Sequence, residues 1–297
     1  MNPKPKAYLQ LHWAVFLFGF TAILGDLISL PAVTLVWWRM LFTCISIIFI
    51  LRVRRHIKQL EAHMVRKYMG VGVLVGLHWI TFFGSVKLAN ASVALVCMAT
   101  SAFFTSILEP LITGDRRKGH ELVLGLIVVP GMILVVNGID RIMMNGVWVG
   151  LISAILAAAF ASYNKRYIAE ANPVLITFLE LGSGWILISF LLMGMLLSGS
   201  TFEFWPNKSD LIYLVILSLV CTTWGYVLAL KSLRQLSAFS AMMAINLEPV
   251  YGIILAFFIL KEGDELTGQF YFGVAVIILA IFLHPFIRSR IKPSVHV

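Results

Sequence analysis

Four ionisable side chains lie well inside long apolar stretches of the sequence: Arg39, His78, Glu180 and Glu248. An ionisable residue deep in a lipid-embedded helix costs at least about 2.5–3.5 kcal/mol, so it usually faces a cavity or a partner. The planar fork of arginine binds carboxylate or phosphate groups, histidine exchanges protons near neutral pH, and glutamate accepts protons or cationic groups. These four residues are therefore candidates for binding a small polar molecule or a proton.

Each candidate also has a structural alternative. Glu248 precedes Pro249, which kinks a helix and leaves nearby carbonyls open; it either accepts a proton or a cation, or it is hydrogen-bonded to neighbouring helices. Arg39 either binds a ligand or pairs with Glu180, although the two are expected at different depths. His78 either relays protons or is a neutral histidine in a helix seam. No second His or Cys lies at ligand spacing, so no metal site is predicted.

Aromatic side chains accompany these candidates. Trp38 and Trp79 are each adjacent to a candidate residue, and Trp224 and Tyr226 lie in a later apolar stretch. We expect Trp79, Trp224 and Tyr226 to lie at depth, where they can wall a cavity and stack on rings or cations. The alternative for each is core packing or lipid contact.

The amino-acid composition indicates the environment that surrounds these residues. The chain has 297 residues, of which 60% are hydrophobic and 12% charged, whereas soluble domains carry about 25% charged residues. This excludes an ordinary soluble enzyme and a disordered chain. The three scattered cysteines form neither a disulfide framework nor a zinc spacing. The net charge of +9 lies in short clusters between apolar runs, which indicates membrane topology rather than nucleic-acid binding.

Apolar runs between polar breaks predict ten transmembrane helices. A span needs about 20 apolar residues, and helices satisfy their own backbone hydrogen bonds, as lipid cannot. The first span is interpreted as uncleaved, because it is long for a signal peptide. The predicted spans are 9–28, 32–51, 68–87, 91–112, 121–138, 146–164, 174–197, 211–231, 238–260 and 268–287.

The distribution of basic residues supports this order of spans. Of the 23 lysine and arginine residues, 18 fall on the N-terminal side of the predicted membrane, four on the opposite side, and Arg39 within a span. Since Lys and Arg are enriched in cytoplasmic loops, both termini are predicted to be cytoplasmic.

Two further features of the spans have a structural interpretation. Glu109, followed by Pro110 near the cytoplasmic end of the fourth span, suggests a helix-end cap or a gate. Small residues at four-residue spacing let helices approach closely, which predicts packing seams. They are Gly72 and Gly76 in the third span, and Gly146, Gly150, Ala154 and Ala158 in the sixth.

The two halves of the chain resemble each other. An offset of 147 residues aligns Asp115 with Glu262, and Ser101-Ala102 with Glu248-Pro249. Five spans per half is an odd number, so the second half enters the membrane from the opposite side, the inverted-repeat pattern of many secondary transporters. We therefore predict an all-α integral membrane protein with a first five-helix repeat at 1–140 and a second at 141–297.

At this level the sequence resembles the EamA-type, ten-helix members of the drug/metabolite transporter superfamily. The resemblance covers nearly the whole chain and is carried by LEPVYGIILAFFILKE (247–262), SVKLANASVALV (85–96), FLFGFTAILG (16–25) and the Trp38-Arg39 pair. The first half departs from the repeat, with Ser101-Ala102 where the second half has Glu248-Pro249. The sequence therefore does not predict matched carboxylates in the two halves.

The resemblance implies two inverted repeats around a central cavity, with spans five and ten as peripheral braces. It implies export or exchange of small metabolites, with amino acids or related compounds as the substrate class. It also implies a bacterial inner (plasma) membrane as the location. No G-x-x-x-x-G-K-[ST] loop is present to bind nucleotide, so no cofactor is predicted.

The resulting prediction is a secondary transporter that works by alternating access. A membrane enzyme is disfavoured, since the spans contain no nucleophile–base pair, metal cluster or acidic diad at usable spacing. One alternative is a sealed membrane scaffold or sensor that does not transport. Within transport, the alternative is a broad-specificity drug or cation exporter. The sequence leaves proton coupling, exchange, a simple gradient and the oligomeric state open.

Overall fold

The computed structural model describes residues 3–50, 53–115, 119–126, 128–245, 247–261 and 266–290. All regular secondary-structure elements in these residues are helices. In chain order they are α1 (Pro3–Leu27), α2 (Ala32–Ile50), α3 (Val53–Ile57), α4 (Ala62–Leu88), α5 (Ala91–Ala99), α6 (Ser101–Thr113), α7 (Gly119–Leu126), α8 (Val128–Asn137), η1 (Arg141–Met143), α9 (Met144–Tyr167), α10 (Pro173–Leu197), α11 (Lys208–Ile216), the π-helical η2 (Leu217–Trp224), α12 (Gly225–Leu233), α13 (Ala238–Ile245), α14 (Glu248–Leu255), the π-helical η3 (Ala256–Leu260) and α15 (Gly268–Arg290). The predicted all-helical membrane fold is confirmed.

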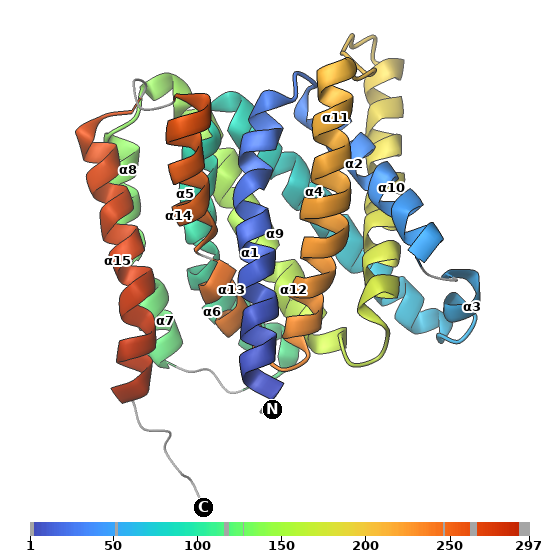
Figure 1. Ribbon diagram of the computed structural model, residues 1–297, viewed down its shortest axis with the longest axis horizontal. Coiled ribbons are helices and arrows are strands. Elements are labelled where there is room, and N and C mark those ends of the chain that lie inside the picture. The colour runs from blue at the N-terminus through green and yellow to red at the C-terminus, as the bar shows by residue number, and fades with distance from the viewer. Residues whose placement is uncertain are drawn as a thin grey trace, which may run out of the picture.

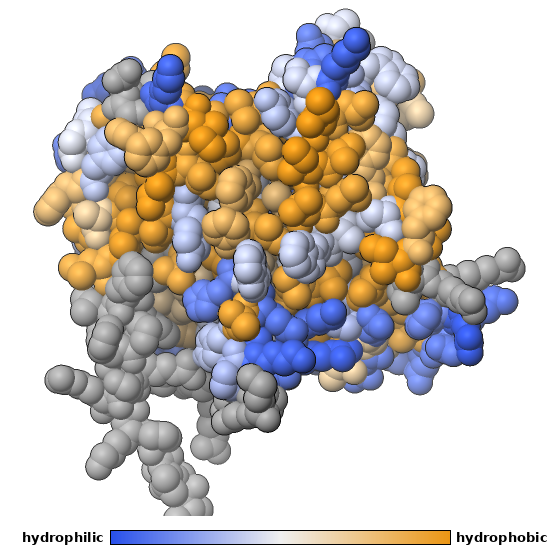
Figure 2. Space-filling view, in the orientation of Figure 1, coloured by the Kyte–Doolittle hydropathy of each residue, from blue (hydrophilic) through white to orange (hydrophobic). Residues whose placement is uncertain are grey.

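Seven of the helical segments are long and apolar enough to cross a membrane. The helices α5 and α6 form an eighth if they are taken as one span bent by 40°, and two shorter apolar helices cover Glu121–Asn137 and Gly268–Leu279. All of these segments overlap the predicted spans. Figure 2 shows a continuous hydrophobic band across the middle of the molecule, with hydrophilic side chains gathered along its lower edge.

Some helices extend beyond the predicted spans. The third span is predicted to begin at residue 68, but α4 begins at Ala62 and includes Arg66 and Lys67. The helix α1 begins at Pro3, before Lys6. Lysine and arginine are good helix formers and keep their charges in water while their stems lie on apolar surface. The helices therefore continue past the point where hydrophobicity ends.

Corresponding helices of the two halves run in opposite directions. In Figure 1, α7 and α8 ascend while α15 descends beside α8, and α5–α6 descends while α13–α14 ascends. The second of these pairs keeps the offset found in the sequence: 147 residues separate Ala91 from Ala238, where α5 and α13 begin, and Ser101 from Glu248, where α6 and α14 begin. The arrangement is that of inverted repeats, with a helix break at the same place in each.

Glycines form the predicted seams between helices. A Cβ atom on Gly72 of α4 would overlap the backbone of Glu180 and the side chain of Ser183 on α10. A Cβ atom on Gly150 of α9 would lie 2.8 Å from Cβ of Cys97 on α5. The interpretation of these small residues as packing positions is confirmed.

Glu109 caps a helix of the other half. Its carboxylate accepts hydrogen bonds from the backbone N–H groups of Ala238 (2.9 Å) and Phe239 (2.6 Å), the first residues of α13. The first N–H groups of a helix lack intrahelical partners, and a carboxylate there also complements the helix dipole. Of the two interpretations offered for Glu109, this geometry supports the cap.

We expect Glu109→Ala to lower the free energy of unfolding by about 1–2 kcal/mol, the usual cost of losing an N-cap. Thermal unfolding of the purified protein in detergent measures the change. Glu203→Ala, at an exposed loop position, is the control that removes a carboxylate without removing a cap. Equal melting temperatures for the two variants would contradict the proposed role of Glu109.

Candidate functional site

A cavity of about 100 Å³ lies between the two halves of the fold. This is several times the roughly 10–15 Å³ that a polar cavity needs to hold one water. Its described lining comes from α1, α2, α4, α5, α9, α12, α13 and α14, and no described residue of α7, α8 or α15 contributes. Most of the lining is apolar; the polar lining residues are Thr21, Arg39, His78, Asn164, Tyr226 and Glu248.

Arg39 is held in the cavity wall by a hydrogen bond and an aromatic ring. Its Nε donates to Oγ1 of Thr222 at 2.7 Å, and its guanidinium carbon lies 3.8 Å from the centre of the Trp79 ring. Thr222 belongs to the π-helical segment η2, and its own hydroxyl donates to the Leu217 carbonyl. Within the described chain Arg39 forms no salt bridge, so its positive charge faces the cavity without a carboxylate partner in contact.

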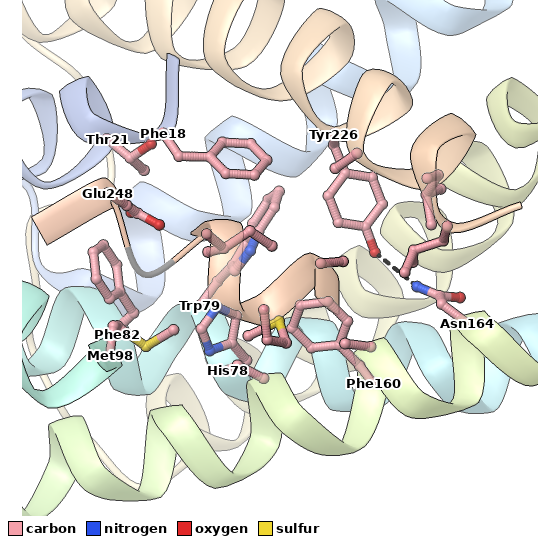
Figure 3. A pocket seen from close by; sticks show the side chains of 18 of the residues that line it. Phe18, Thr21, His78, Trp79, Phe82, Met98, Phe160, Asn164, Tyr226 and Glu248 are labelled. Carbon is pink, nitrogen blue, oxygen red and sulfur yellow. Dashed lines mark hydrogen bonds between the residues drawn. The ribbon is translucent and has the colours of Figure 1, made fainter. Parts of the chain in front are cut away.

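Glu248 is the acidic residue of the same cavity. It is the first residue of α14, its side chain is 7% exposed, and its carboxyl group forms no salt bridge with a described residue. Figure 3 shows its carboxylate beside Thr21, at the end of the cavity away from Tyr226 and Asn164. Pro249, from which the sequence predicts a kink, is the second residue of α14 and follows the break between α13 and α14.

His78 lines the cavity but is tied to α9. Its Nδ1 lies 2.8 Å from the hydroxyl and 3.0 Å from the carbonyl oxygen of Ser153, whose hydroxyl is also within 3.1 Å of the His78 carbonyl. The imidazole stacks obliquely near Phe160, with ring centres 5.2 Å apart. This geometry is that of the structural alternative, a histidine satisfied within a helix seam.

Glu180 lies behind the cavity wall rather than in it. Its Oε2 accepts a hydrogen bond from the hydroxyl of Tyr226 at 2.6 Å and a longer one from the amide of Asn164 at 3.4 Å. Tyr226 and Asn164 line the cavity, whereas Glu180 is fully buried. Arg39 and Glu180 therefore have separate partners, and the alternative in which they pair with each other is not observed.

Two of the predicted aromatic residues line the cavity and two do not. Trp79 and Tyr226 form part of the wall. Trp224 is 55% exposed, which corrects the expectation that it walls the cavity: residues two apart on a helix point about 200° from each other, so Trp224 and Tyr226 cannot both face inward. Trp38 donates to the carbonyl of Phe204 at 2.7 Å and packs in an aromatic cluster outside the cavity lining.

Asn164, Thr222 and Ser153 are polar site residues that the sequence analysis missed. None is ionisable, so a search for costly charges in apolar stretches passes over them. Asn164 lies near the end of a predicted span, where an amide is unremarkable. The helical spacing of Asn164 from Phe160 and Ala161, which share its face, is the signal that points to it.

Comparisons with known proteins agree with this architecture. The EamA-like transporter family matches the chain twice, at residues 5–137 and 144–284. An uncharacterized transporter of Synechocystis sp. is 25% identical over 255 residues, covering 81% of this chain and 73% of that protein. The probable amino-acid metabolite efflux pump of Escherichia coli K12 is 23% identical over 298 residues, covering 96% of both chains.

A solved crystal structure shares the fold, with a TM-score of 0.69 and 14% sequence identity over 98% of this chain and 100% of the other. The family matches cover both halves, and the long apolar helices place the protein in a membrane. The family match and the names of the relatives indicate a transporter of small molecules rather than an enzyme. The chain belongs to the EamA-like transporter family.

Proposed function

We propose that this transporter exports amino acids or related small polar metabolites by alternating access, and that the cavity is its binding site. One observation carries the proposal: the walls of a single cavity hold Arg39 and Glu248, and neither is in contact with a neutralising partner among the described residues. An α-amino acid carries one carboxylate and one ammonium group, so Arg39 and Glu248 are complementary to its two charges.

Several features support the direction and setting. The relative in Escherichia coli that spans almost the whole chain is named as an amino-acid metabolite efflux pump. The concentration of basic residues on the N-terminal side favours cytoplasmic termini. The membrane that we propose is a bacterial inner membrane. The repeats, 1–140 and 141–297, would rock against each other around the cavity, as in other inverted-repeat carriers.

Counterflow in proteoliposomes tests this proposal with three matched solutes. We expect a neutral amino acid to be exchanged, and the corresponding amine and carboxylic acid, which each lack one charge, to compete poorly. Hydrogen bonds to charged groups contribute about 1.5–3 kcal/mol, so each loss should weaken competition roughly 10–150-fold. Equal competition by all three solutes would contradict recognition of both charges.

A broad-specificity drug or cation exporter is the alternative, and the cavity lining gives it a specific basis. Trp79, Phe160 and Tyr226 offer ring faces, and Glu248 offers a negative charge; both attract cations. Strong competition by lipophilic cations, with weak competition by amino acids, would favour this alternative.

We expect Glu248→Gln to reduce amino-acid exchange at least tenfold at neutral pH, because the ammonium group loses its charged partner. Exchange measured across a pH series would also lose any dependence that comes from titration of this carboxyl group. Glu203→Gln, in an exposed loop, is the matched control. An unchanged rate and an unchanged pH profile would remove Glu248 from the mechanism.

A further inference from the structure

A second buried acid, Glu180, has an unfinished hydrogen-bond network. Its side chain is fully buried, and its Oε2 accepts hydrogen bonds from Tyr226 and Asn164. Its other oxygen, Oε1, has no hydrogen-bond partner within the described chain, and the same is true of Oδ1 of Asn164. Two acceptor oxygens therefore lie in the protein interior without a donor.

The groups that surround Glu180 offer no compensating positive charge. From α12 the titratable neighbour is Tyr226, and from α4 it is Tyr68, whose hydroxyl donates to the Tyr167 carbonyl at 2.8 Å. From α2 the charged residue is Arg39, which bonds Thr222. The next residue of α9 after Asn164 is Lys165, which donates to the Leu233 carbonyl.

Further basic residues near α10 form no salt bridge with Glu180 in the described chain. The short helix α3, which packs against α10, carries Arg55, which is exposed, and His56. Arg234 donates to the Ala171 carbonyl at 2.5 Å. In the part of the chain that the structure describes, Glu180 has no salt bridge. A buried carboxylate without a cation is strongly disfavoured, and a carboxylic acid with its proton is the form that two neutral donors can accommodate.

We propose that Glu180 is a proton-binding site separate from Glu248, and that it exchanges its proton with the cavity beside Tyr226 and Asn164. The proton on Glu180 supplies the missing donor of the network. On release, the O–H bond of the acid breaks and its proton passes to the hydroxyl oxygen of Tyr226, which lines the cavity and gives its own proton to a water molecule there, with no other covalent change. Figure 3 shows Tyr226 and Asn164 together at the end of the cavity opposite Glu248, so the partners of Glu180 and the side chain of Glu248 lie at different ends of the cavity.

The ionised form of Glu180 would favour a different packing of α10 against α12, because its charge is poorly accommodated here. Proton release would therefore be linked to a change in conformation, as for any equilibrium in which one state binds the ligand better. This link to transport rests on the proposed function, whereas proton binding by Glu180 does not.

Infrared spectroscopy of the full-length protein in lipid nanodiscs tests the site without any substrate. The carbonyl band of protonated carboxyl groups is recorded in H₂O and D₂O over a pH series for wild type, Glu180→Gln and Glu248→Gln. We expect Glu180→Gln to abolish one deuterium-sensitive band that Glu248→Gln retains. Tyr226→Phe should shift the same band, since the acid loses a hydrogen bond.

Identical carboxyl spectra for wild type and Glu180→Gln at every pH would overturn the proposal. Elution volume and melting temperature show whether each variant is folded; if Glu180→Gln is not, the shift of the band in Tyr226→Phe decides. Substrate-induced proton release is then measured in weakly buffered detergent solution. If the Glu180 band is present but the protein does not exchange amino acids, the proton site stands and the proposed function is rejected. The two failures are therefore distinguishable.

Discussion

Lysine in place of Arg39 is expected to lower amino-acid exchange roughly 10–100-fold, even though the positive charge is kept. Hydrogen bonds to charged groups contribute about 1.5–3 kcal/mol, and a lysine ammonium reproduces neither the planar fork nor its stacking on an aromatic ring. In the native protein, Nε is occupied by Thr222 and one face of the guanidinium lies 3.8 Å from the centre of the Trp79 ring. These contacts orient the guanidinium group of Arg39 and leave its two other nitrogens available to a substrate.

The Arg39→Lys measurement is counterflow with the same amino acid, at several concentrations, in proteoliposomes of equal protein content. The apparent affinity should change more than the maximal rate, because the variant loses binding geometry rather than the conformational step. Arg55→Lys, at an exposed position of α3, is the matched control. Exchange within twofold of wild type for Arg39→Lys would show that the guanidinium does not bind the substrate.

A single methyl group at Gly72 is expected to destabilise the protein by about 3 kcal/mol or more, above the usual range for an inserted methylene. The added Cβ would overlap the carbonyl oxygen and Cα of Glu180 and the hydroxyl of Ser183. The obstacle is largely backbone, so α4 and α10 must separate for Ala to fit. Because these helices belong to opposite halves, the change acts on their contact.

Gly70→Ala is the matched control for Gly72→Ala, since it lies two residues away on α4 and a Cβ there meets no atom within 4 Å. Thermal unfolding in detergent should show a large loss of stability for Gly72→Ala. Gly70→Ala should be unchanged or slightly stabilised, because alanine favours helix over glycine. Similar melting temperatures for the two variants would contradict the close α4–α10 seam.

The features of this protein that depend on one helix at a time could be predicted from the sequence. Hydrophobic length identifies the helices, glycine spacing identifies the seam at Gly72, and the offset of 147 residues aligns the two halves. The break before Ser101 is not predicted, because the fourth span, 91–112, is expected to be one helix. The cost of charge in lipid identifies Arg39 and Glu248. Each of these signals can be found along the sequence without knowing how the helices face one another.

The features that depend on how helices face one another could not be predicted in the same way. Trp224 and Tyr226 belong to the same apolar run, and only the rotation of that segment decides which one faces the cavity. Glu180 is as costly in lipid as Glu248, yet it lies one layer farther from the cavity behind Tyr226. Asn164 is uncharged, so its part in the site follows from its neighbours alone.

Substrate protection of an engineered cysteine tests the central claim, that the substrate occupies the cavity between the halves. In a background without Cys44, Cys97 and Cys221, Ala161→Cys places a thiol in the cavity wall, and Ile152→Cys places one on the same helix at a half-exposed surface position. Ile152 lies in a candidate membrane span, so lipid is expected to shield a thiol on its outer surface. A charged thiol reagent should therefore label Ala161→Cys and not Ile152→Cys, and a transported amino acid should slow that labelling. Labelling of Ala161→Cys that no transported solute slows, or no labelling at all, would contradict the account.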